Sequence, residues 1–321
     1  MEVLIFSHES DMDGLFSAAI GLIRYPQART VFLGYGKESF ETMGHFANTF
    51  SASSPTSEKR IIIICDLGLN EDQSLIDLCI GFFSKAKNDG CDIFWLDHHP
   101  WPDRAVEAVK PFVEITLDKT GNKCAAELMY DKLLVGNELA AKLASMAHTM
   151  DFFTNDQYLT PISELIVYYR NSPIPFEKLS SLAVKASRGI LWDMEMQNDY
   201  AMYSEIQEKA KREACQTIQF KEIDGRFKTA FIQSSPYIQN SMFAHEIFEK
   251  TKTDIAVLYR TDGKVSIRRN NAQVSCRRIA ENLPEGGGHD FAAGAKYNSD
   301  PSKPQAIIME LEAAILKSLK G

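Results

Sequence analysis

Acidic and histidine side chains gather in four short clusters of the sequence, and three of these clusters follow an apolar run. The apolar runs lie at 2–6, 61–65 and 92–96, and the fourth cluster lies in a segment with helical spacing. The chemistry-bearing residues are His8, Asp11 and Asp13, then Asp66, then Asp97, His98 and His99, and finally Asp151. Because carboxylates brought to one place repel each other without a cation, this set predicts a divalent-metal site.

Each cluster alone is a weak signal. Two aspartates one residue apart, such as Asp11 and Asp13, are common in turns, and a single Asp after a strand often caps a helix. The adjacent His98 and His99 are harder to explain in this way, because histidine accounts for only 7 of the 321 residues. Carboxylate and imidazole donors without a thiolate suit manganese better than a structural zinc, and they also accept magnesium or cobalt.

The apolar runs read as strands of a parallel sheet. The run at 60–65, RIIIIC, is β-branched and does not alternate, which is typical of a strand covered on both faces. Strands are predicted at 2–6, 31–35, 60–65, 92–96 and 111–117, with helices from about Leu15 and over 73–87. This alternation predicts an α/β fold with a doubly wound parallel sheet. Such sheets bind ligands at the carboxyl ends of their strands, where three of the clusters stand.

The pattern changes in the second half of the chain. Apolar residues recur at helical spacing over 123–220, including a long charged helix over about 194–220. Strand and helix patterns return from about Gly225 and predict a smaller α/β domain. The expected organisation is a catalytic domain at 1–190, a helical linker at 191–222 and a substrate-binding domain at 223–321.

Composition limits the class of protein. The chain is 45% hydrophobic and 24% charged, which is ordinary for a globular protein, and its net charge of −8 disfavours long duplex nucleic acid as a partner. No segment approaches the roughly 20 apolar residues that span a bilayer, and the N-terminus does not read as a signal peptide. We therefore expect a cytoplasmic protein with no membrane partner. The six cysteines form no CxxC pair and are expected to be reduced.

The clusters, taken in order, resemble the motifs of the DHH phosphoesterase superfamily, whose name-giving triplet stands here as Asp97-His98-His99. The run at 285–294, EGGGHDFAAG, resembles the signature of the DHHA1 substrate-binding domain, and VSIRR at 265–269 resembles the strand before it. The resemblance spans nearly the whole chain, and GGGH is its most specific part. Family II inorganic pyrophosphatases resemble the chain only in the first domain.

The resemblance implies two divalent ions about 3.5–4 Å apart, with an active site in the interdomain cleft. Asp66 would bridge the two ions, and a water or hydroxide between them would attack phosphorus. The remaining implied ligands are His8 and Asp11 for one ion, and Asp13, His98 and Asp151 for the other.

Two further roles follow from the resemblance. Asp97 would orient His98, and His99 would contact the scissile phosphate. The first motif departs from the pattern of many family members, because Asp11 follows His8 by three residues rather than four. The residues that compete with Asp151 for its role are His148 and Asp156.

The second domain supplies anion-binding chemistry. Arg268 ends a strand directed at the glycine loop, where a guanidinium can bind a phosphate through two hydrogen bonds. The glycines of that loop, Gly286, Gly287 and Gly288, can bring backbone N–H groups close to an anion. The resemblance implies that His289 faces the metal site and binds the substrate phosphate.

Other residues of this domain are open to two interpretations. Arg277 and Arg278 stand on a presumed helix, where a solvated surface explains them. Base stacking needs an exposed aromatic side chain. Phe291, Tyr237 and Tyr259 are the candidates for stacking, and burial in the core is the alternative that we favour for each of them.

The sequence therefore predicts a metal-dependent phosphodiesterase or exonuclease that hydrolyses very short oligonucleotides, as a nanoRNase does, and that also removes phosphate from 3′-phosphoadenosine 5′-phosphate. A cyclic dinucleotide phosphodiesterase and a single-strand DNA exonuclease are the alternatives, although relatives of these kinds usually carry further domains. A non-catalytic scaffold on the same fold would have lost metal ligands, and all of them are present here. Substrate length, sugar, polarity of cleavage and oligomeric state, including a homodimer, stay open.

Overall fold

The computed structural model describes residues 1–52, 59–152 and 159–320. The chain divides into two compact units, Met1–Tyr200 and Ala201–Gly321. The division falls inside the long helix α9 (Met194–Gln216), within the segment that the sequence assigns to a linker.

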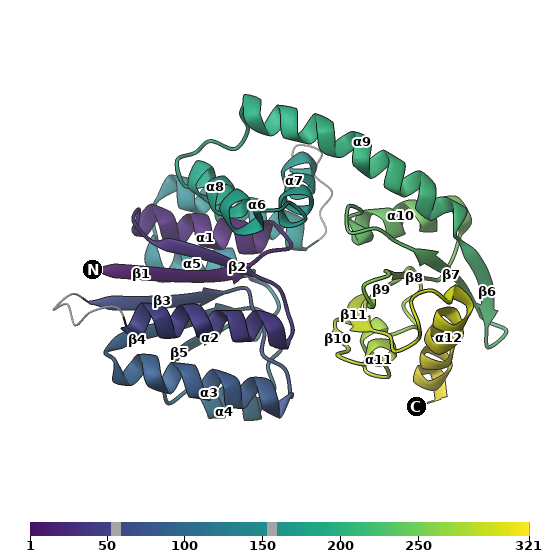
Figure 1. The fold of residues 1–321 in the computed structure, drawn as a ribbon, viewed down its shortest axis with the longest axis horizontal. Helices are drawn as coiled ribbons and strands as arrows, with labels where there is room; N and C mark the ends of the chain where they lie inside the picture. Colours follow the sequence, from purple (N-terminus) through teal and green to yellow (C-terminus); the bar gives the residue numbers. More distant parts are fainter. Residues whose placement is uncertain (53–58, 153–158, 321) are drawn as a thin grey trace. The chain divides into compact units, whose positions relative to one another are not determined.

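The first unit is built on a five-stranded sheet with the order β2-β1-β3-β4-β5 (Figure 1). Every neighbouring pair in this sheet is parallel, which confirms the predicted parallel α/β fold. The central strand β3 is buried at all six residues, as its run of isoleucines predicts. The strands are β1 (Glu2–His8), β2 (Arg29–Leu33), β3 (Arg60–Cys65), β4 (Cys91–Asp97) and β5 (Glu114–Leu117).

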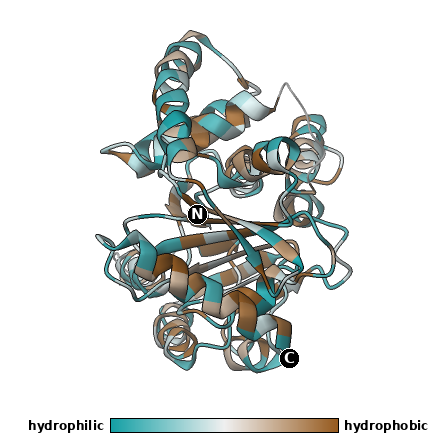
Figure 2. Cartoon of the chain, turned by 90° about the vertical axis from the view of Figure 1, so that its right-hand side faces the viewer, coloured by the Kyte–Doolittle hydropathy of each residue, from teal (hydrophilic) through white to brown (hydrophobic). Residues whose placement is uncertain are grey.

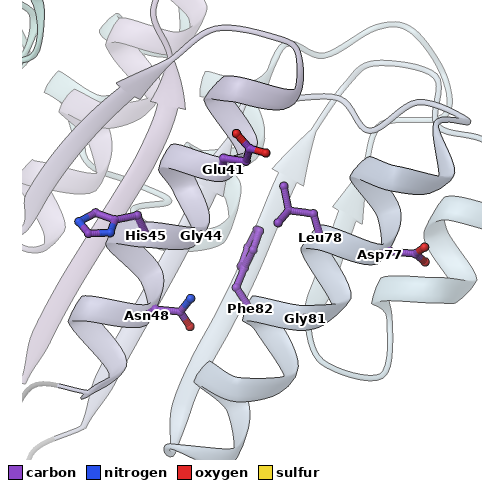
Figure 3. Close-up of a pocket in the computed structure, with 8 residues that line it drawn as sticks. All are labelled: Glu41, Gly44, His45, Asn48, Asp77, Leu78, Gly81 and Phe82. Carbon is purple, nitrogen blue, oxygen red and sulfur yellow. The ribbon is translucent and has the colours of Figure 1, made fainter.

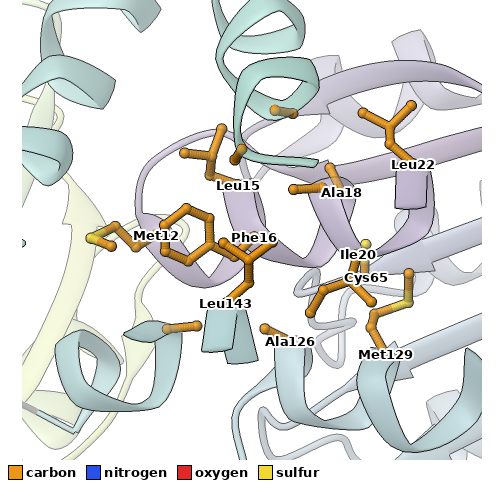
Figure 4. Packing of buried hydrophobic residues seen from close by; sticks show 14 of the residues in the cluster. Met12, Leu15, Phe16, Ala18, Ile20, Leu22, Cys65, Ala126, Met129 and Leu143 are labelled. Carbon is orange, nitrogen blue, oxygen red and sulfur yellow. The ribbon is translucent and has the colours of Figure 1, made fainter. Parts of the chain in front are cut away.

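Helices cover both faces of this sheet. On one face α1, α5, α6, α7 and α8 share a hydrophobic core with the strands, and on the other face α2, α3 and α4 do so. Figure 4 shows the first of these cores, where apolar side chains of α1 meet Cys65 of β3 and Met129 of α5. The helices are α1 (Met12–Arg24), α2 (Lys37–Ala52), α3 (Gln73–Asn88), α4 (Asp103–Val109), α5 (Ala125–Leu133), α6 (Glu138–Asp151), α7 (Thr160–Arg170) and α8 (Pro175–Ser187).

Gly14 allows α1 to begin close to the end of β1. A Cβ atom at this position would lie 2.2 Å from the carbonyl oxygen of His8, whereas one at Gly81 of α3 would meet nothing within 4 Å. We expect Gly14→Ala to destabilise the chain by roughly 2 kcal/mol or more, because the backbone of His8 must move. We expect Gly81→Ala to stabilise it by about 0.5–1 kcal/mol through helix propensity. Thermal denaturation measures both, and equal melting temperatures for the two variants would contradict this interpretation.

The second unit contains a six-stranded mixed sheet with the order β10-β11-β9-β8-β7-β6, which confirms the smaller α/β domain. Only β7 and β8 are parallel neighbours in this sheet. Helices α9 and α10 (Asn240–Thr251) pack on one face, and α11 (Cys276–Ala280) and α12 (Pro304–Lys320) pack on the other. Its strands are β6 (Gln219–Ile223), β7 (Phe227–Gln233), β8 (Ile255–Tyr259), β9 (Lys264–Arg269), β10 (Gly287–Gly288) and β11 (Ala292–Lys296). Helices of the chain carry hydrophobic and hydrophilic residues side by side, as amphipathic helices do (Figure 2).

Two predicted boundaries differ from the structure. The long helix predicted over 194–220 ends at Gln216, and Gln219–Ile223 forms β6 instead, because it pairs along its whole length with β7. The strand predicted at 31–35 lies two residues earlier, so that Tyr35 stands after the strand rather than within it.

Two predictions from composition can be compared with the structure. All six cysteines are free thiols, and five of them are buried, which confirms the predicted absence of a disulfide framework. Within the described residues, no helix has the length and apolar character needed to cross a membrane.

Candidate metal centre

The acidic and histidine clusters converge at the carboxyl end of the first sheet. His8 and Asp97 are the last residues of β1 and β4, and Asp66 directly follows β3. Asp151 is the last residue of α6, and its carboxylate lies 3.7 Å from His98 Nδ1. The parallel strands therefore bring the clusters together, as the position of a ligand site in such sheets requires.

Asp66 lies at the middle of the cluster, and its side chain is buried. Its Oδ1 atom is 3.4 Å from His98 Nε2 and 3.9 Å from His99 Nδ1, and its Oδ2 atom is 3.5 Å from His8 Nδ1. The backbone of Asp66 has a φ angle of +59°, a left-handed conformation that is costly for a residue other than glycine. This strained turn places one carboxylate among three imidazoles.

Three groups of possible donors lie at this centre, one of which joins Asp66 and the triplet Asp97-His98-His99, and the other two contain the predicted ligands. The first of these two joins His8, Asp11 and Asp66, with His8 Nδ1 2.9 Å from Asp11 Oδ2. The second joins Asp13, His98 and Asp151, with His98 Nε2 3.6 Å from Asp13 Oδ2. Within each group all the donor atoms lie within 4.8 Å of one another. The structure thus brings together all six residues predicted as ligands, and their binding of ions stays a prediction.

Two of the aspartates also bind helix N-termini. Asp13 accepts hydrogen bonds from the backbone N–H groups of Ala125 and Ala126 at the start of α5, both at 2.7 Å. Asp11 is the N-cap of α1 and accepts from Gly14 N at 3.1 Å. The helix-cap interpretation of these aspartates is therefore correct as far as it goes. It is compatible with metal binding, because hydrogen bonds from a helix N-terminus hold a carboxylate in one orientation.

Asp97 orients a different histidine from the one predicted. Its Oδ1 atom lies 2.8 Å from His99 Nδ1, and its Oδ2 atom accepts a hydrogen bond from Trp101 Nε1 at 2.6 Å. The expected partner, His98, turns instead towards Asp13 and Asp66. The prediction that Asp97 orients His98 was wrong, because the chain turns after β4 in a way that brings His99 rather than His98 to the Asp97 carboxylate.

Tyr35 belongs to this site and was missed from the sequence. Its hydroxyl lies 3.3 Å from His99 Nε2 and accepts a hydrogen bond from Gly68 N at 3.4 Å. Its ring lies 5.0 Å from that of His8, centroid to centroid, and the residue is 49% exposed. The available signal was position, since Tyr35 follows β2 at the same sheet edge as the clusters.

Two other residues, His148 and Asp156, could have been the metal ligand in place of Asp151, and the structure describes only the first of them. His148 Nδ1 lies 2.7 Å from Glu127 Oε2 and belongs to none of the donor groups found among the described residues. Asp156 lies outside the described residues.

Charge accumulates in the metal-free site. Burial raises the pKa of Asp13, and the neighbouring Asp66 carboxylate raises it further. Burial also raises the pKa of Asp151 to about 6, against the opposing effect of His98. Burial lowers the pKa of His98, but its hydrogen bond to Asp66 and the charge of Asp13 outweigh this and raise it to about 10. Asp13 and Asp151 thus hold their protons more tightly than isolated carboxyl groups, as expected where like charges crowd, and a bound cation would favour their ionised forms.

The donor set fits divalent ions. His8 Nδ1 and Asp66 Oδ2 are buried and lie 3.5 Å apart, and Asp11 Oδ2 lies 2.9 Å from the same imidazole nitrogen. Lone pairs placed this closely in a buried site are the donors that a divalent ion accepts. Oxygen and imidazole donors without sulfur are compatible with manganese, magnesium or cobalt.

The raised pKa of Asp151 predicts a pH-dependent stability of the metal-free protein. A carboxyl group with a folded pKa of about 6 and an ordinary unfolded pKa of 3.8 binds its proton more tightly in the folded state, so stability is lost as pH rises from about 4 to 6. We expect Asp151→Asn and the wild type to be similar near pH 4, and the variant to be more stable by about 2 kcal/mol at pH 7. Urea denaturation in the presence of a chelator measures this. A difference that stays constant between pH 4 and 7 would contradict it.

Arg268 of the second unit is half-buried, and its guanidinium has neutral partners. Its guanidinium donates to Ser241 Oγ at 3.0 Å and to the carbonyl oxygen of Ile267 at 2.9 Å. Its hydrogen bonds within the described part of the chain go to a hydroxyl and to backbone carbonyl oxygens and to no carboxylate, and desolvation lowers its pKa to about 10. A half-buried guanidinium with only neutral partners keeps the capacity to bind an anion.

Packing of the backbone requires glycine at two of the three positions of the loop at 286–288. A Cβ atom on Gly286 would lie 1.7 Å from the carbonyl oxygen of Ala280, and Gly288 has a φ angle of +129°, so local packing alone requires both. Gly287 differs, because nothing lies within 4 Å of its hypothetical Cβ atom. His289 follows this loop, and its ring stacks on that of Phe291.

Of the remaining predictions for the second unit, some are confirmed and one is wrong. Arg277 and Arg278 are exposed on α11, which confirms the solvated-surface interpretation. Tyr259 is buried, as we expected, whereas Phe291 is 47% exposed, so the expectation that it lies in the core was wrong. The tip of a two-residue hairpin cannot reach the core, which is why Phe291 is exposed.

A separate hollow of about 370 Å³ lies between α2 and α3 (Figure 3). Gly44 and Gly81 line it from the two helices, and the ring of Phe82 stands between them. It shares no residue with the donor groups, so it is not part of the candidate metal centre.

Comparisons with known proteins agree with both units. Residues 2–155 match the family model described as DHH family, N-terminal domain, and residues 238–317 match the DHHA1 domain. No curated protein matches the sequence of this chain.

Solved structures share the fold at low identity. One is described as the DHH domain of a member of the s1p family of ribosomal proteins. It is 14% identical, with a TM-score of 0.66, and the match covers 98% of this chain and 87% of that one. Another is an exopolyphosphatase-related protein from Bacteroides fragilis. It is 13% identical, with a TM-score of 0.58, and the match covers 100% of this chain and 94% of that one. Identities of this size show a similar fold and nothing about substrate.

Proposed function

This chain belongs to the DHH family and carries a DHHA1 domain, and from this membership we propose that it is a metal-dependent phosphodiesterase that hydrolyses very short oligonucleotides. The coarser statement, a phosphoesterase of the DHH superfamily, follows from the two family models. The finer statement adds the substrate class, and it includes 3′-phosphoadenosine 5′-phosphate as a second substrate.

The observation that carries the proposal is the position of Asp66 between two groups of donors. Each group offers carboxylate and imidazole atoms within 4.8 Å of one another, and Asp66 contacts histidines of both. Divalent ions held there would lower the pKa of a water molecule and stabilise charge on phosphoryl oxygens. His8 and Asp11 would hold one ion, Asp13, His98 and Asp151 would hold the other, and Asp66 would contact both.

The side chains around this centre hold one another in position and take no part in bond breaking themselves. Asp97 fixes the ring of His99 through Nδ1, and Trp101 fixes Asp97 in turn. This arrangement sets His99 Nε2 beside the exposed Tyr35, from where we propose that it contacts the scissile phosphate. A histidine held by a buried carboxylate keeps one orientation, which lowers the entropy cost of binding the substrate.

In the second unit we propose that Arg268 binds a further phosphate of the substrate. Strand register puts the side chains of Ala292 and Arg268 on one face of the sheet, with Gly294 and Ser266 as the next pair. Gly287 and His289 would add a backbone N–H group and an imidazole to the same anion.

A short substrate is the best match to these features. The net charge of −8 disfavours binding of a long polyanion over a wide surface, whereas one half-buried arginine and one metal cluster suffice for two phosphates. A non-catalytic scaffold would not need six converging metal donors, and their presence argues against it.

A hydrolysis panel with added manganese tests the proposal. The substrates are a labelled dinucleotide, a 5-mer, a 24-mer, 3′-phosphoadenosine 5′-phosphate, a cyclic dinucleotide and inorganic polyphosphate. We expect the dinucleotide and the 5-mer to have the highest kcat/KM. A preference for the 24-mer would indicate a long-strand exonuclease, and a preference for the cyclic compound would indicate a signalling phosphodiesterase. A preference for polyphosphate would align the chain with the exopolyphosphatase-related protein, and no turnover of any substrate would reject the proposal.

A further inference from the structure

We propose that the stacked rings of His289 and Phe291 form a platform on which a nucleobase stacks. The inference rests on the proposed function and deepens it, because it makes a nucleotide, rather than an inorganic phosphate chain, the ligand of the second unit. It assigns to Phe291 a role in substrate specificity that neither the metal cluster nor the glycine loop supplies.

The platform is the tip of a tight hairpin. Strands β10 and β11 pair through Gly288 and Ala293, and the N–H group of His289 donates to the carbonyl oxygen of Ala292 at 2.8 Å. The rings of His289 and Phe291 lie 5.3 Å apart, centroid to centroid, and their planes differ by only 3°. Phe291 is nevertheless 47% exposed, so part of a flat aromatic surface faces solvent.

The tip is held in place from the opposite side. The residue between the two rings, Asp290, accepts a hydrogen bond from Cys276 N at 2.8 Å through its carbonyl oxygen. Its carboxylate accepts another from the hydroxyl of Ser275, the N-cap of α11. The two rings are therefore presented on a fixed backbone, and a preorganised aromatic surface loses little entropy when a base stacks on it.

The platform adjoins the proposed phosphate-binding arginine. Arg269 N lies 3.4 Å from the carbonyl oxygen of Phe291, and Arg268 pairs in register with Ala292, the next residue. An arginine on the strand next to an exposed aromatic ring suits a nucleotide, since the arginine can contact the phosphate while the ring contacts the base. A ligand made only of phosphate would gain nothing from the ring.

The chain offers a matched control. Phe220 on β6 is 48% exposed, and β6 lies at the opposite edge of the same sheet from β10. The Lys228 Nζ atom lies 5.2 Å from the centroid of its ring, so Phe220 too is an exposed aromatic beside a cation. Within the described parts of the chain no second ring stacks on Phe220, and the adjoining strand β7 contains no arginine.

The test compares the affinities of the full chain for adenosine 5′-monophosphate and for ribose 5-phosphate by isothermal titration calorimetry. The ratio of the two Kd values isolates the contribution of the base. We expect the wild type to bind the nucleotide at least roughly tenfold more tightly, and Phe291→Leu to bring the ratio to within about twofold of unity. Phe291→Trp should keep the ratio, because indole also stacks, and Phe220→Leu should keep it as well.

Each outcome decides the inference. A wild-type ratio near unity, or an unchanged ratio in Phe291→Leu, overturns the platform. Equal losses in Phe291→Leu and Phe220→Leu overturn it too, because they would not depend on the stacked pair. Turnover of a dinucleotide is measured in parallel. Turnover with no base-dependent affinity leaves the proposed function and rejects the platform, whereas base-dependent affinity that Phe291→Leu removes, without turnover, keeps the platform and rejects the proposed function.

Discussion

Asp66→Asn is expected to lower kcat for the dinucleotide by roughly 10³-fold or more, because this side chain contacts the histidines of both donor groups. Asparagine is the appropriate replacement, since it tolerates the left-handed backbone that Asp66 adopts, whereas alanine would add strain. Without metal, the variant should be as stable as the wild type or more stable, because one of several crowded carboxylates is gone. Turnover assays and thermal denaturation of the metal-free protein measure the two effects.

Asp224→Asn is the matched control for this variant. Asp224 also has a positive φ angle, of 56°, but it lies in an exposed turn between β6 and β7. The control should keep full activity and stability. Activity of Asp66→Asn within tenfold of the wild type, or a large loss of its metal-free stability, would show that Asp66 supports the fold rather than the chemistry.

Manganese is expected to stabilise the first unit strongly. Binding to the folded state alone adds about 2.7 kcal/mol when the free metal is 100 times its Kd, which corresponds to roughly 5–10 °C in melting temperature for a unit of this size. The physical reason is that the ions neutralise buried carboxylates that otherwise repel. Differential scanning calorimetry of chelator-treated protein, with and without manganese, measures the shift.

The two units allow an internal control in that measurement. All the donor groups found among the described residues belong to Met1–Tyr200, so only the transition of the first unit should move. Asp66→Asn should lose most of the shift. An equal shift of both transitions, or of the variant and the wild type, would indicate non-specific binding of the metal and contradict the assigned site.

The sequence predicts most of the first sheet and most of the acidic and histidine cluster. The reason is that the apolar runs predict the strands, and the ends of these strands carry the cluster. Buried parallel strands are β-branched and short, as in 60–65, and the residue after such a strand lies at the ligand-binding edge. That is how Asp66 and the run beginning at Asp97 could be assigned to one site before any contact was known. The donor groups then follow from topology rather than from side-chain detail.

What the sequence does not predict depends on side-chain direction and on weak strand signals. Nothing in the order of residues tells that Asp97 faces His99 rather than His98, because that depends on how the chain turns after β4. The sequence pattern includes Tyr35 in the predicted strand. Only the structure shows that β2 ends at Leu33, two residues before it. Strand β10 consists of two glycines, whose low strand propensity hides it, and it forms only because β11 pairs with it.

The central claim is that this chain hydrolyses phosphate esters with divalent ions held around Asp66. The most direct measurement is the initial rate of dinucleotide hydrolysis by chelator-treated wild-type protein as manganese is titrated in. We predict no hydrolysis without metal and a saturable rise to full activity as the donor groups fill. Hydrolysis that is independent of metal, or its absence at every manganese concentration, would contradict the claim.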